Sequence, residues 1–343
     1  MMNCKYFHFL IGVCCWALSA TTIFAQKKNE LFTDACRKGA MSQAIVVPGK
    51  GDWAFLKSEL RFLSSGDFWG KNAEKTSQSQ KANARDPLAA KVAYQQALSE
   101  EGIDLLLLPI PPKAVVYPDK LPGPDLPVER YDVSLQRFYD LLRQKGVSVL
   151  DVTTNLLAAR KTSDEPLYCM GDSHYSGYGC KVVAEALAKE IRNRYKLSGK
   201  GKFQTNPQVV SISGDLYKAA QDLPGNKLPR AEKRTLYSVS GKETNSKDSP
   251  ILVLGDSHTL VFEVGSDLFA THSGLPSLLA AALGMPVDVI GVRGSGATPA
   301  RLNAYRRSRS DNSFLKKKRL FVWCFAAREF TEASEWNTAV PVK

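Results

Sequence analysis

The chain has 343 residues, of which 44% are hydrophobic and 23% are charged. These proportions are ordinary for a globular protein, exclude global disorder, and allow one large domain or two modest ones. The net charge of +12 favours an acidic partner. An anionic polysaccharide or an envelope surface fits better than nucleic acid, because the chain carries no recognisable nucleic-acid-binding motif. Part of the charge lies in Arg301–Arg319, which a solvated helix face and loop explain at least as well.

The first 25 residues have the pattern of an export signal. Lys5 precedes the apolar run Phe7–Ala20, and the small residue Ala25 ends a cleavage site. An uncleaved N-terminal anchor is the alternative, because the apolar stretch lies near the lower length limit for spanning a bilayer. We expect cleavage after Ala25, and no later stretch has the length and hydrophobicity needed to cross a membrane.

Export would leave four cysteines in an oxidising compartment, namely Cys36, Cys169, Cys180 and Cys324. An even number permits disulfides, in three possible pairings among which the sequence does not choose. A bridge from Cys169 or Cys180 would brace the loop between them. No CxxC or histidine-rich spacing indicates a zinc site, and we predict neither a metal nor a cofactor.

Short apolar runs bounded by turn-forming residues predict five buried strands: Asp104–Ile110, Val147–Val152, Ile251–Leu254, Val287–Val292 and Leu320–Phe325. Between them lie segments with helical patterns: Leu88–Glu101, Glu129–Lys145, Cys180–Tyr195, Leu275–Leu283 and Pro299–Arg309. Strands that alternate with helices and lack polar alternation indicate a mostly parallel sheet covered on both faces. The predicted fold is a three-layer α/β/α sandwich. Gly70–Asp86 is expected to be a mobile loop, and residues 197–249 a polar insertion or linker.

The tetrapeptide GDSH occurs twice, and the first copy stands in a glycine-containing loop before a predicted helix. Asp172 and His174 of this copy lie two residues apart. A serine nucleophile needs an imidazole to take its proton, and the imidazole needs a carboxylate to fix its tautomer. The loop supplies both groups. A turn-capping Asp172 beside an incidental His174 is the structural alternative.

The second copy follows the predicted strand Ile251–Leu254 directly and contains Ser257. Active sites of open α/β sheets gather beyond the carboxyl ends of the strands, where backbone N–H groups also stabilise an oxyanion. A simple helix cap after a core strand is the alternative. After residue 25 the remaining histidines are His258, which adjoins Ser257, and His272, which has no evident carboxylate partner. We therefore predict an Asp172–His174–Ser257 triad.

Together these motifs resemble the SGNH hydrolase superfamily, with the Asp/His loop preceding the serine. That order is similar to the alginate O-acetylation proteins of the bacterial periplasm, the AlgX and AlgJ type, whose Asp/His motif is usually written DTHW. Here Tyr175 replaces the tryptophan. Further similar segments are Pro48–Leu56, Pro111–Lys113, Tyr117–Leu121 and Val149–Asp151, so the resemblance covers roughly Pro48 to Arg328.

The resemblance implies a periplasmic O-acetyltransferase with an SGNH-like fold, a polysaccharide acceptor and a membrane-bound acyltransferase that provides acetyl groups. Residues 26–343 would form one catalytic domain of the AlgJ-like type, without the C-terminal carbohydrate-binding module of AlgX-type proteins. Candidate oxyanion donors are the Ser257 N–H and the loop Gly294-Ser295-Gly296, and candidate contacts to an anionic substrate are Arg301 and Arg328. Each arginine could equally serve in a surface salt bridge.

Two other functions remain open from the sequence. A carbohydrate esterase would use the same acyl-enzyme, with water as the acceptor. A polysaccharide-binding scaffold with an idle serine would use no chemistry at all. The resemblance favours transfer, and the coincidence of both motifs with their expected context disfavours the scaffold.

Overall fold

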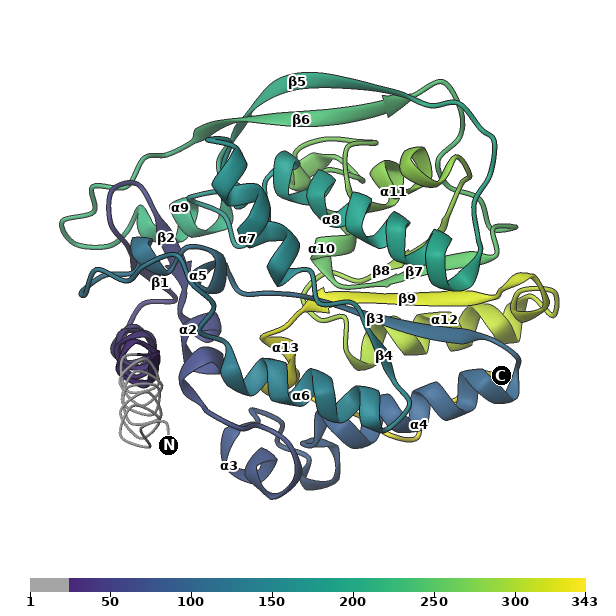
Figure 1. Cartoon of the computed structure of the whole chain (residues 1–343), viewed down its shortest axis with the longest axis horizontal. Helices are drawn as coiled ribbons and strands as arrows, with labels where there is room; N and C mark the ends of the chain where they lie inside the picture. Colours follow the sequence, from purple (N-terminus) through teal and green to yellow (C-terminus); the bar gives the residue numbers. More distant parts are fainter. Residues whose placement is uncertain (1–24) are drawn as a thin grey trace, which may run out of the picture.

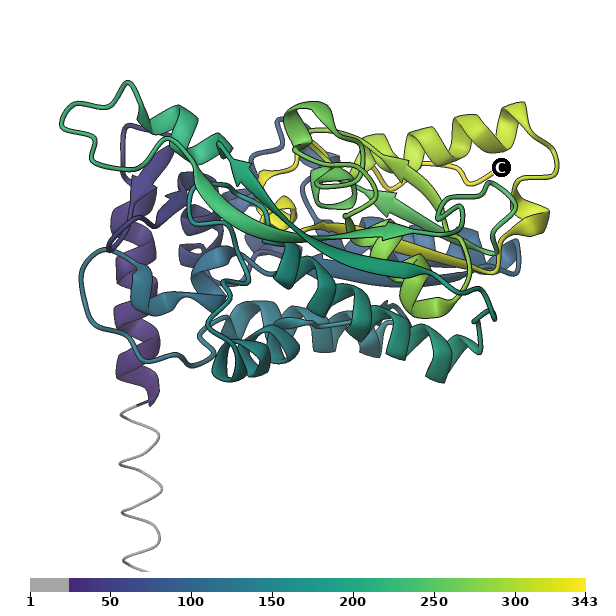
Figure 2. The ribbon, with the colours of Figure 1, turned by 90° about the horizontal axis from the view of Figure 1, so that it is seen from above.

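The computed structural model describes residues 25–343 and begins with a helix over residues 25–40. The predicted export signal lies outside the described residues, apart from Ala25. Figure 2 shows the first helix standing along one side of the molecule. Phe32 and Cys36 are buried, and Phe32 stacks on Tyr131 with ring centroids 5.0 Å apart, so the helix packs on the body of the protein. Within residues 25–343, no helix combines the length and hydrophobicity of a membrane span.

The centre of the fold is a sheet of five strands in the order β4-β3-β9-β7-β8. The strands are β3 (Asp104–Ile110), β4 (Ser148–Val149), β7 (Ile251–Gly255), β8 (Asp288–Gly291) and β9 (Leu320–Ala326). Every pair is parallel, and each predicted strand contributes, although β4 is shorter than expected. Residues of β3, β7 and β9 are buried on both faces, which explains why their sequences are continuous apolar runs.

Helices cover both faces of the sheet, as the predicted three-layer sandwich requires (Figure 1). One apolar core contains residues of α8 (Gly177–Glu190) and α11 (Leu275–Leu283). The other contains residues of α4 (Pro87–Glu100), α6 (Val133–Gln144) and α12 (Thr298–Ser310). Alternate residues of β3 point into the two cores, because neighbouring side chains of a strand face opposite ways.

Shorter elements complete the chain. They are β1 (Val46–Pro48), β2 (Ala54–Leu56), α2 (Lys57–Ser64), η1 (Gly70–Asn72), α3 (Ala73–Thr76), η2 (Ala82–Ala84), α5 (Lys113–Val116), η3 (Pro118–Lys120), α7 (Thr153–Thr162), η4 (Ile191–Tyr195), α10 (Ser257–Leu260), η5 (Ser266–Leu268), η6 (Leu315–Lys317) and α13 (Glu329–Glu332). The segment Gly70–Asp86, expected to be a loop, therefore holds three short helical turns.

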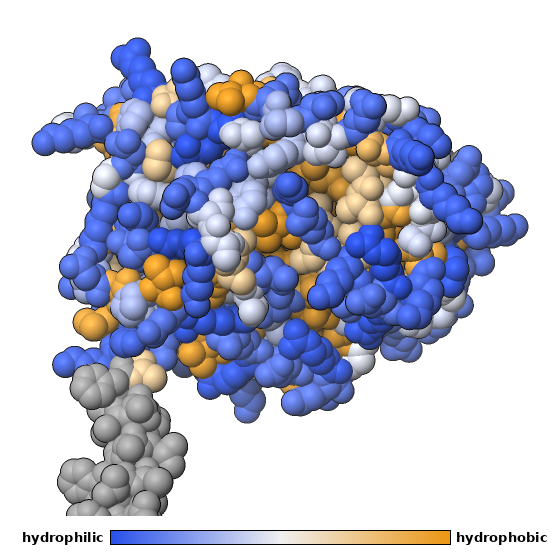
Figure 3. All heavy atoms as spheres, turned by 45° about the horizontal axis from the view of Figure 1, so that its top comes forward, coloured by the Kyte–Doolittle hydropathy of each residue, from blue (hydrophilic) through white to orange (hydrophobic). Residues whose placement is uncertain are grey.

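Residues 197–249, expected to be a polar insertion or linker, contain an antiparallel ribbon. Strands β5 (Gln204–Ile212) and β6 (Glu232–Ser240) pair along nine residues each, and α9 (Asp215–Ala220) lies between them. Figure 1 shows the ribbon passing over α8 and α11, and Figure 3 shows a surface on this side that is largely hydrophilic with smaller apolar areas. Most of β5 is exposed, so its sequence carries little apolar signal, and composition alone missed it.

The four cysteines after residue 25 are free thiols and are all buried. The disulfides that an oxidising compartment would permit are thus not formed, and no bridge from Cys169 or Cys180 braces the loop between them. Burial raises the pKa of each thiol, most clearly for Cys169 and Cys324. These side chains pack as small apolar groups.

Candidate active site

The predicted nucleophile lies at the turn from β7 into α10. Gly255 ends the strand, where any side chain would collide with the carbonyl oxygen of Cys324 on neighbouring β9. Asp256 caps α10, because its Oδ1 accepts from His258 N at 2.9 Å. Its Oδ2 accepts from Ala326 N of β9 at 2.7 Å. Ser257 is half-buried whereas both of its neighbours are buried. As the first residue of a helix, Ser257 also has a backbone N–H that the helix does not use.

The Asp/His loop enters from the other side of the site, immediately before α8. Ser176 caps that helix by accepting a hydrogen bond from Gly179 N at 3.1 Å. Within the loop, Asp172 Oδ1 accepts from His174 N at 3.0 Å, which curls the backbone so that both side chains point the same way. The local geometry of the first GDSH copy therefore places a carboxylate directly against an imidazole.

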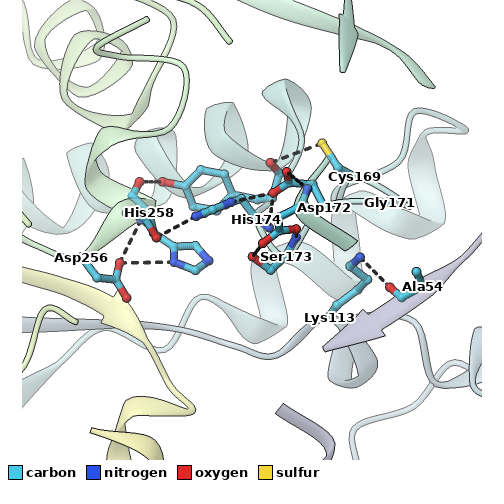
Figure 4. Close-up of polar contacts among 12 residues, drawn as sticks. Ala54, Lys113, Cys169, Gly171, Asp172, Ser173, His174, Asp256 and His258 are labelled. Atoms are coloured by element: carbon cyan, nitrogen blue, oxygen red, sulfur yellow. Dashed lines mark hydrogen bonds and ion pairs between the residues drawn. The ribbon is translucent and has the colours of Figure 1, made fainter. Parts of the chain in front are cut away.

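The structure brings the two GDSH copies together (Figure 4). His174 Nδ1 lies 2.6 Å from Asp172 Oδ1, and His174 Nε2 lies 2.8 Å from Ser257 Oγ. A carboxylate only accepts hydrogen bonds, so Nδ1 carries the proton and Nε2 accepts the serine hydroxyl. This chain of two hydrogen bonds is the arrangement in which a serine hydroxyl can lose its proton as it attacks.

Electrostatics within the pair favour charge separation. Burial disfavours the ionised carboxylate, but the neighbouring His174 outweighs it and holds the pKa of Asp172 down to about 2. Burial likewise opposes the imidazolium, but Asp172 and the hydrogen bond to it raise the net pKa of His174. Asp172 thus stays ionised and makes His174 a stronger base than a free imidazole.

Sequence reasoning missed the two carboxylates that hold this loop, Asp215 at the start of α9 and Glu232 at the start of β6. Asp215 accepts from Ser173 N at 2.7 Å and from Ser173 Oγ at 2.6 Å, and its own N–H donates to Asp172 Oδ2 at 3.0 Å. Glu232 accepts from Met170 N at 3.1 Å and from Gly171 N at 2.8 Å. These two carboxylates therefore clamp the Asp/His loop, and no local sequence signal linked such distant residues to it.

A buried ion cluster lies beneath the same loop. Lys113 is fully buried and donates through Nζ to the carbonyl oxygens of Ala54 at 2.8 Å and Met170 at 3.1 Å (Figure 4). Glu59 faces Arg328 at 3.4 Å. Lys113 belongs to the Pro111–Lys113 segment that carried the family resemblance, and its contact with Met170 gives that segment a structural role.

The loop containing Gly294, Ser295 and Gly296 lies against the nucleophile turn, as expected for a candidate oxyanion loop. A Cβ at Gly296 would come within 3.0 Å of Gly255 C, so the two backbones pack directly. Gly296 also accepts from Trp323 Nε1 at 2.8 Å, and Ser295 donates to Glu329 at 2.6 Å. The structure places the loop beside Ser257, and a role in binding an oxyanion stays a prediction.

The two arginines predicted to contact substrate differ. Arg301 is fully buried and donates to the carbonyl oxygens of Ala297 and Asn337 at 3.2 and 2.8 Å. Its guanidinium also lies over Trp323, 5.0 Å from the ring centroid. A substrate contact through Arg301 is thus wrong, because the side chain belongs to the core. Arg328 follows β9 and keeps 13% of its side chain exposed, so it remains a candidate.

Three basic residues of the stretch Arg301–Arg319 form ion pairs within the protein. Arg307 and Lys318 contact Asp288 at 2.7 and 2.8 Å, and Lys317 contacts Asp248 at 2.6 Å. The Asp288 pairs are largely buried, so this part of the stretch is not the solvated face that the sequence suggested, and its charges are not free to bind a polyanion.

One group of side chains could in principle hold a cation. Asp172, His174 and Asp215 offer ligand atoms within 4.8 Å of one another. These side chains already make hydrogen bonds within the protein. Asp172 accepts from the Asp215 N–H, Asp215 accepts from Ser173, and the His174 ring bonds to Asp172 and Ser257. The donor set is therefore that of a proton-transfer site, and we assign no metal to it.

A parallel sheet with a serine after one strand and an Asp/His pair before a helix defines an SGNH hydrolase-like domain. Residues 46–327 match the family described as “SGNH hydrolase-like domain, acetyltransferase AlgX”. The chain belongs to this family.

Individual proteins similar to this chain are described as members of the same kind. The “Probable alginate O-acetylase AlgJ” of Pseudomonas fluorescens is 26% identical over 94% of this chain and 75% of its own length. The protein of the same description from Pseudomonas syringae pv. tomato is 25% identical over 57% of this chain, and the match spans 48% of that relative. In fold, the “O-Acetyltransferase Domain of Pseudomonas putida AlgJ” superposes with a TM-score of 0.63 at 22% identity, covering 84% of this chain and 93% of that one.

Proposed function

We propose that the protein is an O-acetyltransferase that moves an acetyl group through an acyl-enzyme on Ser257 to a hydroxyl of an exported, alginate-like polysaccharide. The observation that carries the proposal is the hydrogen-bonded chain Asp172–His174–Ser257. Family membership and relatives described as probable alginate O-acetylases support the choice of acetyl transfer.

The chemistry has two halves. In the first, Ser257 Oγ attacks the acetyl carbonyl carbon while His174 Nε2 takes the hydroxyl proton, and the departing donor group receives that proton. In the second, a sugar hydroxyl attacks the carbonyl carbon of the acetyl-serine and gives its proton to His174. The bond from that carbon to Ser257 Oγ then breaks, and His174 returns the proton to Oγ. Asp172 steadies the imidazolium in both halves. The Ser257 N–H and the Gly294–Gly296 loop would stabilise the oxyanion, and Arg328 would contact an acidic sugar.

The cellular setting belongs to the same proposal. Residues 1–25 would direct export to the periplasm or anchor the chain in the membrane, and residues 26–343 would act as one catalytic domain. A membrane-bound acyltransferase would provide the acetyl group. Neither chemical half needs a cofactor.

The test uses the purified full-length chain with p-nitrophenyl acetate as donor and polymannuronate as acceptor. We expect acetylated polysaccharide from the wild-type chain and none from Ser257→Ala. Acetate released only to water would favour an esterase, and release unaffected by Ser257→Ala would contradict the triad.

A further inference from the structure

The proposed reaction uses Ser257 of the second GDSH copy and leaves its histidine unassigned. His258 adjoins the nucleophile and is 1% exposed. Its ring centroid lies 4.8 Å from that of His174, with the planes tilted by 54°. Figure 4 shows the His258 ring beside His174, with Asp256 on its other side. The site therefore contains two imidazoles, each paired with the aspartate two residues before it.

The orientation of the His258 ring is fixed. Its Nδ1 lies 3.2 Å from Asp256 Oδ1, and the ring of Tyr175 meets it edge-on with centroids 5.4 Å apart. The hydroxyl of Tyr175 donates to the carbonyl oxygen of His258, which holds the backbone as well. Since a carboxylate only accepts, Nδ1 carries the proton and Nε2 presents a lone pair.

Nothing in the described chain uses that lone pair. Among residues 25–343, the one side-chain hydrogen bond of the His258 ring is made by Nδ1, and Nε2 has no hydrogen-bond partner there. Burial lowers the pKa of His258, more than the nearby Asp256 raises it, so the ring is neutral near pH 7. A neutral imidazole acceptor beside a nucleophile fits a hydroxyl donor from a bound molecule.

We infer that His258 binds the acceptor, with Nε2 accepting a hydrogen bond from the hydroxyl next to the one that is acetylated. This inference rests on the proposed function. The reacting hydroxyl gives its proton to His174, while the neighbouring hydroxyl on the same sugar bonds to His258 and exchanges no proton. Two imidazoles with centroids 4.8 Å apart suit two adjacent hydroxyls.

The experiment compares two small acceptors that differ in one hydroxyl, ethylene glycol and 2-methoxyethanol, supplied together with p-nitrophenyl acetate to the full-length chain. Gas chromatography gives the ratio of the two acetate esters. We expect the wild-type chain to prefer ethylene glycol by roughly three- to tenfold per hydroxyl, the effect of one hydrogen bond. Because the readout is a ratio of products, it does not depend on the amount of active protein.

His258→Asn keeps an amide that can reach Asp256 but has no atom in place of Nε2, so the preference should fall to about one. His258→Gln restores a polar atom near that position and should recover part of the preference. If His258→Asn does not fold, His258→Gln is the variant that tests the inference. His272→Asn, the same change at an exposed histidine, is the matched control and should retain the wild-type ratio.

An unchanged ratio in His258→Asn, or no preference in the wild-type chain, would overturn the inference and leave the proposed transferase intact. If Ser257→Ala forms both esters at the wild-type rate, the proposed function fails, and the inference fails with it.

Discussion

Nε2 of His174 lies 2.8 Å from Oγ of Ser257, although 83 positions separate the two residues in the chain. The contact forms because the carboxyl end of β7 and the loop before α8 meet at one edge of the sheet. Each residue is held by its own copy of GDSH, and the two copies supply different parts. Asp172 orients His174 in the first, whereas Asp256 caps the helix that begins at Ser257 in the second.

The pH dependence of acylation should report the raised pKa of His174. The imidazole must be neutral to take the serine proton, and Asp172 favours its protonated form. Activity should therefore fall as the pH drops through a pKa above the ordinary histidine value of about 6.5. The measurement is kcat/KM for p-nitrophenyl acetate between pH 5 and 9. An acid limb centred below that ordinary value would contradict the assignment.

Removing the clamp on the Asp/His loop should slow catalysis. Asp215→Ala deletes two hydrogen bonds to Ser173, so we expect kcat to fall roughly ten- to hundredfold, as for the loss of a charged hydrogen-bond partner. KM for the ester donor should change little, because Asp215 makes its contacts with the loop. Asp222→Asn, on an exposed turn after α9, is the control. Equal kcat values for the two variants would show that the clamp does not position the triad.

Substitutions at Arg301 and Arg328 should affect different properties of the protein, stability at Arg301 and acceptor binding at Arg328. Arg301→Ala removes a fully buried side chain and should lower the free energy of unfolding by about 2–4 kcal/mol. Arg328→Lys keeps the charge and should instead raise KM for an anionic polysaccharide by several-fold at unchanged kcat, because the planar guanidinium is lost. Denaturant unfolding and acceptor titration measure the two effects. A stable Arg301→Ala variant with raised acceptor KM would reverse these assignments.

Thiol chemistry tests the cysteine finding. The thiols at positions 36, 169, 180 and 324 are free and buried, and burial raises their pKa. In the folded protein we expect iodoacetamide to leave these four thiols unmodified. In guanidinium chloride, where the protein unfolds, all four should react. Peptide mapping by mass spectrometry locates the labels. A disulfide-linked peptide among them would contradict the structure.

The sheet could be predicted from sequence because its strands are buried on both faces. Runs such as Leu320–Phe325 and Asp104–Ile110 have no polar alternation, and the structure places both in the centre of the sheet. The triad residues could be selected because few histidines compete for the role of base. The β5–β6 ribbon escaped prediction because exposed strands carry little apolar periodicity. The prediction that Arg301 contacts substrate was wrong because its basic neighbours in sequence suggested an exposed face, whereas Arg301 lies on the buried face of α12.

The most direct test of the account is the mass of the protein during turnover. The full-length chain, mixed briefly with p-nitrophenyl acetate and quenched in acid, should gain the mass of one acetyl group, and peptide mapping should place it on Ser257. Ser257→Ala should gain none, and His174→Ala should gain it at least a thousandfold more slowly, as in other serine–histidine sites. An acetyl group on another residue, or turnover by Ser257→Ala at the wild-type rate, would contradict the account.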